Sequence, residues 1–236
     1  MKYGFAFIDL DDTVFNSKSL YDQAIYMAWE HFRKFYEDID YPAFEKTFLD
    51  TRTELKEEFK HLTISHNRAI LFGRLLEKFE IPFNAELIQD LYDTYWFAVN
   101  VHIQPFPGVL KTLESLKEDG VRLLALSDGS LLSRLEKINS LKMSKHFDYL
   151  VSSEEVVYTK PKPQIFELAM QKAEVQDKKE ILFVGNSYSA DVIGGKSFGV
   201  DTCWFNLENE KISENVKYKP DYQISDFTEI LKIMEG

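Results

Sequence analysis

The fold is decided by residues 5–15, which read FAFIDLDDTVF. The apolar start of this stretch predicts a buried β-strand, and the polar residues after it predict a turn. Asp9 and Asp11 are two positions apart at the strand end, so their carboxylates point to the same side. Two acids aimed at one point suit a metal ion or a phosphoryl group held between them. An isolated Asp-x-Asp is more often only a strand followed by an ordinary polar turn, so the rest of the sequence has to decide.

Composition and charge limit the class of protein. With 236 residues and 44% hydrophobic residues, the chain can bury a sizeable core as one domain or one domain with an insertion. Its formal net charge of −11 argues against DNA or RNA as a partner, because long polyanions need a basic face. A small phosphate is still possible, since a few backbone amides and one lysine can hold it locally.

The single cysteine, Cys203, lies in the apolar run of residues 200–205. A buried, inert thiol is expected there, and one cysteine suits a reducing compartment. No run approaches the ~18 apolar residues of a membrane span, and no signal peptide precedes the first strand. We therefore expect a cytoplasmic protein without a membrane partner.

Residues 17–101 have a helical pattern throughout. Apolar residues recur there at helix spacing in four groups: Leu20, Ala24, Met27, Ala28 and Phe32; Phe44, Phe48, Leu55 and Phe59; Leu71, Leu75, Leu76 and Phe79; and Leu87, Ile88 and Leu91. Pro42 suits a first helical position, and Ser65 and Asn84 are candidate N-caps. This segment is predicted to form about four helices.

From residue 105 onward, predicted helices and strands alternate. The expected elements are a helix at 108–118, strands at 121–126 and 149–151, a helix starting near Pro163, a strand at 181–184, a helix ending near Gly199 and a strand at 202–205. Such alternation predicts an α/β fold whose parallel sheet has helices on both faces. The helical segment falls between the first and second strands, which makes it an insertion at the carboxyl edge of the sheet, where such folds bind ligands.

Three further segments place polar residues at a strand end or just before a helix. Ser127, Asp128 and Gly129 offer a hydroxyl and two backbone N–H groups where a helix begins, which suits an anion, although Ser127 alone also reads as an N-cap. Lys160 precedes a proline, so a stiff extended backbone can present its charge to a phosphate. An isolated Lys-Pro is also typical of a solvated lysine before a helix.

Asn186 and Asp191 lie in the turn and helix start after the strand at 181–184. Their side-chain oxygens are the ligands that magnesium prefers. The alternative is that Asn186 ends the strand and Asp191 favours the first turn of a helix. Because the carboxyl ends of parallel strands meet at one crevice, we expect all these residues to lie together.

The order and spacing of these segments resemble the haloacid dehalogenase superfamily, in its phosphatase branch with a helical cap inserted after the first strand. The resemblance rests on residues 7–14, 105–108, Ser127, 160–166 and 185–199. Residues 194–205 are also similar to the ending of the pyrimidine 5′-nucleotidases of that branch. The implied fold is a Rossmann-like doubly wound parallel sheet, with residues 1–16 and 102–236 as the catalytic core and 17–101 as an inserted four-helix cap domain.

The resemblance also implies roles for individual residues. Asp9 would be the nucleophile that forms an aspartyl-phosphate, Asp11 the acid and base, and Lys160 the cation that offsets the charge of nucleophile and phosphate. The implied substrate-binding residues are Ser127, Asp128, Gly129 and Thr13, and the implied magnesium ligands are Asp9, Asp11, Asn186 and Asp191. The substrate would be a small phosphorylated metabolite bound by a monomer or homodimer, and a nucleoside 5′-monophosphate is one candidate.

Two positions depart from the family pattern. Asn186 stands where the branch usually has an aspartate, so magnesium affinity should fall unless Asp191 compensates. Asp128 stands where an asparagine is common. Asp11 favours a phosphatase over a 2-haloacid dehalogenase, since a halide leaves without protonation. A dehalogenase, a phosphosugar mutase and a catalytically weakened phosphometabolite-binding protein remain alternatives.

Overall fold

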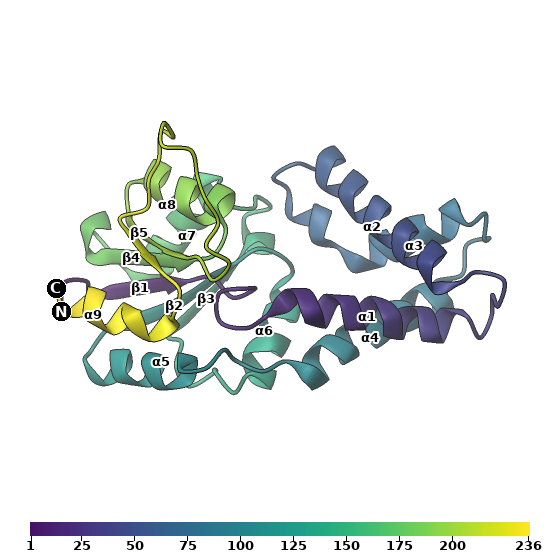
Figure 1. Ribbon diagram of the computed structural model, residues 1–236, viewed down its shortest axis with the longest axis horizontal. Coiled ribbons are helices and arrows are strands. Elements are labelled where there is room, and N and C mark those ends of the chain that lie inside the picture. Colours follow the sequence, from purple (N-terminus) through teal and green to yellow (C-terminus); the bar gives the residue numbers. More distant parts are fainter. The chain divides into compact units, whose positions relative to one another are not determined.

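The computed structural model describes all 236 residues, in two compact units. The core unit consists of Met1–Asn16 and Gln104–Gly236, and the helical unit consists of Ser17–Ile103 (Figure 1). The chain therefore leaves the core unit after its first strand and returns to it once. No helix is long and apolar enough to cross a membrane.

The core unit contains one six-stranded parallel sheet with the strand order β3-β2-β1-β4-β5-β6. Its strands are β1 (Phe5–Ile8), β2 (Arg122–Ser127), β3 (Tyr149–Ser152), β4 (Ile181–Gly185), β5 (Asp201–Phe205) and β6 (Tyr222–Ile224). The predicted α/β fold with a parallel sheet is confirmed. Strand β1 pairs with both β2 and β4, and its residues Ala6, Phe7 and Ile8 are buried on both faces, as is typical of a central parallel strand.

Helices cover both faces of this sheet. They are α5 (Val109–Glu118), α6 (Leu131–Ser140), α7 (Pro163–Ala173), α8 (Ile193–Phe198) and α9 (Ile230–Glu235). Phe7, Leu124 and Phe183 point to one face and pack with Ile165 and Phe166 of α7. Helices α7 and α8 lie on that side of the sheet and α5 and α9 on the other (Figure 1).

Several elements differ from the predicted ones. Strand β6 and helix α9 were not expected, because three and six residues are too short to give a periodic signal. The helix before Gly199 starts as a π-helical turn, η4 (Tyr188–Val192), which continues into α8. Short 3₁₀ turns also occur at η2 (Ser153–Glu155), η3 (Lys178–Glu180) and η5 (Phe227–Glu229).

The helical unit contains α1 (Ser17–Phe32), α2 (Tyr41–Glu58), the 3₁₀ turn η1 (Thr63–His66), α3 (Arg68–Lys78) and α4 (Ala85–His102). Pro42 lies in the first turn of α2, and Asn84 caps α4 by accepting a hydrogen bond from the Leu87 amide. The cap of α3 is Asn67, while the expected Ser65 lies within η1 and donates to the Leu62 carbonyl. The unit has its own apolar core, in which six of the eighteen buried residues are aromatic.

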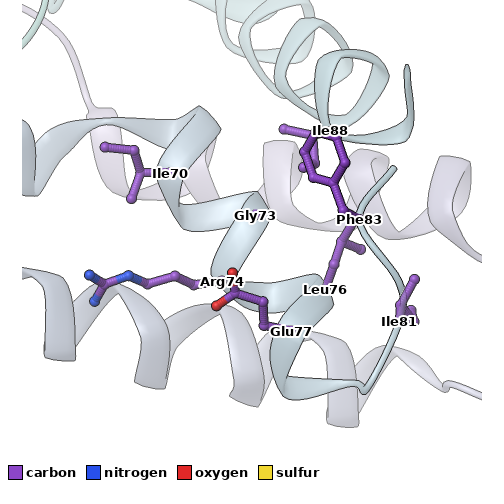
Figure 2. A pocket seen from close by; sticks show the side chains of 8 residues that line it. All are labelled: Ile70, Gly73, Arg74, Leu76, Glu77, Ile81, Phe83 and Ile88. Carbon is purple, nitrogen blue, oxygen red and sulfur yellow. The ribbon is translucent and has the colours of Figure 1, made fainter. Parts of the chain in front are cut away.

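A pocket of about 480 Å³ lies within the helical unit (Figure 2). Phe83 and Ile88 both line this pocket, and Figure 2 shows the guanidinium of Arg74 pointing away from them. Arg74 instead forms an ion pair with Glu58. The pocket is lined by Ile70, Gly73, Arg74, Leu76, Glu77, Ile81, Phe83 and Ile88.

Candidate active site

The sheet topology brings the polar strand ends of the core unit together. Asp9 follows β1, Ser127 ends β2 and Asn186 follows β4, and β1 lies between the other two strands. Lys160 lies in the segment between β3 and α7. The side chains meet at the carboxyl edge of the sheet, as expected for a ligand site in such a fold.

Lys160 is the centre of a buried charge cluster. Its ammonium lies 2.6 Å from Asp9 Oδ1 and 2.7 Å from Asp191 Oδ1. Burial raises the pKa of Asp9 to about 6; Lys160 opposes this shift and the Asp191 charge adds to it. Burial likewise raises the pKa of Asp191, and Lys160 opposes the shift. Burial alone would lower the pKa of Lys160, but the surrounding carboxylates raise it well above its usual value, so this lysine is fully charged.

Thr13 links the turn after β1 to the turn after β4. Its hydroxyl oxygen accepts a hydrogen bond from the main-chain N–H of Asn186 at 3.1 Å. Its single proton can go to either Asp9 Oδ2 at 3.2 Å or Asn186 Oδ1 at 3.3 Å. The side-chain oxygens of Asp9 and Asn186 are therefore held on the same side of the site.

Gly185 makes room for Asp191. A Cβ at position 185 would lie 2.4 Å from Asp191 Oδ2, closer than any real contact. The same oxygen accepts a hydrogen bond from the Ser187 amide at 2.8 Å, and Ser187 caps η4. Asp191 can approach Lys160 only because the last residue of β4 has no side chain.

The Asp128 carboxylate and the Gly129 main-chain amide form hydrogen bonds within the protein beside the site. Asp128 Oδ1 accepts a hydrogen bond from the Lys160 amide at 3.0 Å, and burial raises the pKa of Asp128 to about 6. The Gly129 amide donates to Ser153 Oγ at 2.9 Å, so it is already occupied. Both residues were predicted to bind substrate, but the structure gives the carboxylate and the amide partners within the protein.

Asp11 has two cationic partners that sequence reasoning missed. Lys137 Nζ lies 2.7 Å from its Oδ1 and 2.9 Å from its Oδ2. The Arg134 guanidinium lies 3.1 Å from Asp11 Oδ1 and 3.1 Å from Ser127 Oγ. Both cations belong to α6, where Lys137 and Arg134 are 0% and 4% exposed. Leu132 and Leu135 of the same helix are 60% and 44% exposed, which inverts the usual distribution of apolar and charged residues.

The oxygen atoms of the site fit a magnesium ion. Asp9, Asp128 and Asp191 bring three carboxylates around the single cation of Lys160, and those of Asp9 and Asp191 are buried. A divalent cation would offset the remaining negative charge, and the Asn186 amide oxygen lies beside Asp9. No group of three or more His, Cys, Asp and Glu side chains is arranged to hold a metal. The expected set of magnesium ligands thus depends on the side-chain amide oxygen of Asn186 and the main-chain carbonyl of Asp11, in addition to carboxylates.

Comparison with known proteins decides the family. A family model described as haloacid dehalogenase-like hydrolase matches residues 5–199. The chain belongs to the haloacid dehalogenase-like hydrolases. The matched residues include every member of the site described above, so the resemblance inferred from the sequence is confirmed.

Relatives of this haloacid dehalogenase-like hydrolase include named phosphatases. It is 26% identical over 230 residues to the glyceraldehyde 3-phosphate phosphatase of Pyrococcus furiosus, covering 97% of this chain and 92% of that one. It is 24% identical over 242 residues to the pyrimidine 5′-nucleotidase YjjG of Escherichia coli, covering 99% of both.

Solved structures share its fold. The 2-haloacid dehalogenase of Pseudomonas syringae aligns with a TM-score of 0.79 and 20% identity over 99% of this chain and 98% of that one. The HAD-hydrolase YfnB of Bacillus subtilis, bound to magnesium, aligns with a TM-score of 0.76 and 19% identity over 100% of both chains. At these identities the likeness establishes the fold of this hydrolase.

Proposed function

We propose that this hydrolase is a magnesium-dependent phosphatase that cleaves small phosphorylated metabolites through an aspartyl-phosphate on Asp9. The observation that carries the proposal is the position of Lys160, which lies within 2.7 Å of both Asp9 and Asp191. An anionic nucleophile that approaches an anionic phosphate needs such a cation beside it. The named activities of the relatives from Pyrococcus and Escherichia support this class of substrate.

The first half of the reaction transfers the phosphoryl group to the protein. A carboxylate oxygen of Asp9 forms a bond to phosphorus as the bond from phosphorus to the ester oxygen breaks. Asp11 has to take up a proton before this step, because Arg134 and Lys137 favour its ionised form, and it gives that proton to the leaving oxygen so that the alcohol departs neutral. Ser127 donates a hydrogen bond to a phosphoryl oxygen, and Lys160 offsets the negative charge.

The second half releases inorganic phosphate. Asp11, now a carboxylate, takes a proton from a water molecule whose oxygen attacks the phosphorus and breaks the bond to Asp9. Asp9 and Asp11 then regain their starting protonation. Magnesium would be held by Asp9, the Asp11 main-chain carbonyl, Asn186 and Asp191, and would offset negative charge on the phosphoryl group.

Asp11 favours a phosphate ester over a haloacid as the substrate. A halide is a stable anion and leaves without a proton, so a dehalogenase gains nothing from an acid at this position. Here the carboxylate of Asp11 is held by two buried cations from α6, beside the Ser127 hydroxyl. An alkoxide leaving group, by contrast, needs the proton that this acid can supply.

The test is a phosphate-release screen of the whole protein with magnesium, using glyceraldehyde 3-phosphate, pyrimidine nucleoside 5′-monophosphates and a panel of sugar phosphates. We expect release from at least one ester, and none from Asp9→Asn. Asp221→Asn is the matched control, because Asp221 pairs with Lys196 away from the site. Halide release from 2-chloropropionate, isomerisation without phosphate release, or equal activity in Asp9→Asn would overturn the proposal.

A further inference from the structure

We infer that Arg134 and Lys137 are positioning residues, which orient Ser127 toward the phosphate and hold Asp11 toward the leaving group. The inference rests on the proposed phosphatase function. Arg134 lies within hydrogen-bond distance of both Ser127 and Asp11, and Lys137 within that distance of Asp11, although more than 100 residues separate both cations from Asp11.

Arg134 determines which way the Ser127 hydroxyl can donate. One guanidinium nitrogen, Nη1, lies 3.1 Å from both Ser127 Oγ and Asp11 Oδ1. Arginine can only donate, so Ser127 Oγ accepts in this contact and forms no other hydrogen bond within the protein. Its own proton therefore remains available to a phosphoryl oxygen.

Lys137 fixes the Asp11 carboxylate from the other side. Its ammonium contacts both carboxylate oxygens and lies 5.2 Å from the centre of the Phe15 ring. A buried ammonium is costly without a partner, so Lys137 and Asp11 constrain each other. Because Arg134 bonds one of the same oxygens, Asp11 is held next to Ser127 instead of turning to solvent.

The helix and its preceding loop are built to deliver these two side chains. Ser130 caps α6 directly after the Ser127 loop, and residues three apart share a helix face. At Gly129, where φ is +119°, a Cβ would lie 2.9 Å from Arg134 Nη2. Glycine at this position thus leaves the space that the guanidinium fills.

The first test separates positioning from stability by varying the leaving group. In Lys137→Met, kcat should fall at least about tenfold for the best alkyl phosphate identified in the screen. It should fall much less for 4-nitrophenyl phosphate, whose leaving group needs little protonation. KM should change little in both cases. Lys137→Arg should restore part of the kcat for the alkyl phosphate. Lys117→Met removes an ion-paired lysine of α5 and should have the wild-type kcat for both substrates.

A double-mutant cycle keeps the test informative if Lys137→Met folds poorly. Asp11→Asn/Lys137→Met removes both members of the pair, so it leaves no unpaired charge between them. We expect its kcat for the alkyl ester to equal that of Asp11→Asn alone. Equal losses on both leaving groups, additive losses in the cycle, or a faster Lys137→Met would overturn the role of Lys137.

Orthophosphate binding tests the role of Arg134 without turnover. Calorimetry should show that the dissociation constant of orthophosphate is about tenfold larger in Arg134→Gln than in wild type. The double variant Ser127→Ala/Arg134→Gln should bind orthophosphate no more weakly than Ser127→Ala alone. Unchanged binding, or an equal loss with and without Ser127, would overturn the role of Arg134. A wild type that binds phosphate in this way but hydrolyses no ester would refute the proposed function alone.

Discussion

Lys160 is one buried cation shared by three carboxylates. Its ammonium pairs with Asp9 and Asp191, and its amide donates to Asp128. Burial disfavours the ionised form of each carboxylate, and a single lysine cannot offset three negative charges. The charge balance of this site therefore depends on individual residues.

Asp128 should make stability depend on pH. Its pKa rises from 3.8 to about 6 on folding, so the native state binds more protons than the unfolded state between these values. Its contribution to stability is complete below pH 3.8 and is lost as the pH rises through about 6. Asp128→Asn keeps an acceptor for the Lys160 amide and removes the buried charge. At about pH 7 we expect it to be more stable than wild type by ~1–3 kcal/mol, and to lose less stability than wild type on going up from about pH 4.

Denaturant unfolding with a chelator present measures this effect, with Asp119→Asn as an exposed control. If the Asp128→Asn curve followed the wild-type curve at both pH values, the burial of a charged Asp128 would be refuted.

Asn186 should limit magnesium affinity. Its amide oxygen lies beside Asp9, and a carboxylate there would add a full negative charge to the same position. We expect Asn186→Asp to tighten magnesium binding by about tenfold, or ~1.4 kcal/mol, measured by calorimetry and by the magnesium dependence of activity. Asn209→Asp adds the same charge to an exposed loop and should have no effect. Unchanged or weaker binding in Asn186→Asp would remove Asn186 from the proposed ligand set.

At the scale of elements, the junction of β4 and η4 is constrained by the close approach of Asp191 to Gly185. Gly185→Ala would place a methyl group against Asp191 and push it from Lys160 and the Ser187 amide. We expect kcat/KM to fall by at least about tenfold and stability by ~1–3 kcal/mol, as for other overpacked sites. Gly4→Ala, where the added methyl meets nothing within 4 Å, is the control. Wild-type kinetics in Gly185→Ala would show that the position of Asp191 does not matter.

Helix α6 shows why part of the site escapes sequence reasoning. The pattern of its residues would place Leu132 and Leu135 inside, yet these are exposed while Arg134 and Lys137 are buried. Their burial is possible because Asp11 and Ser127 lie opposite them, and Asp11, which contacts both cations, is far from α6 in the sequence. Local periodicity cannot report such a partnership.

At the scale of the whole molecule, the proposed magnesium ligands all belong to the core unit. Magnesium at a hundredfold excess over its dissociation constant should stabilise that unit by about 2.7 kcal/mol. Amide hydrogen exchange should therefore slow in β1 and β4 when magnesium is added, and should remain the same in α2 and α3. In Asp9→Asn, the addition of magnesium should slow amide exchange in β1 and β4 less than in wild type. Equal slowing in both units would contradict a magnesium site confined to the core.

The sequence by itself determined the parallel α/β sheet, the helical character of residues 17–101 and most of the residues that gather at the sheet edge, Arg134 and Lys137 excepted. These follow from local signals: apolar runs, cap residues, and polar residues at strand ends that must converge once the strands are parallel.

Only the tertiary structure decided which of the polar groups at the sheet edge contact one another. It directs Asp128 to the Lys160 amide and the Gly129 amide to Ser153, and it places Lys137 against Asp11. The physical reason is that a hydrogen bond or ion pair depends on side-chain direction within a few tenths of an ångström. That direction is set by packing between elements far apart in the chain, on which the sequence pattern carries no information.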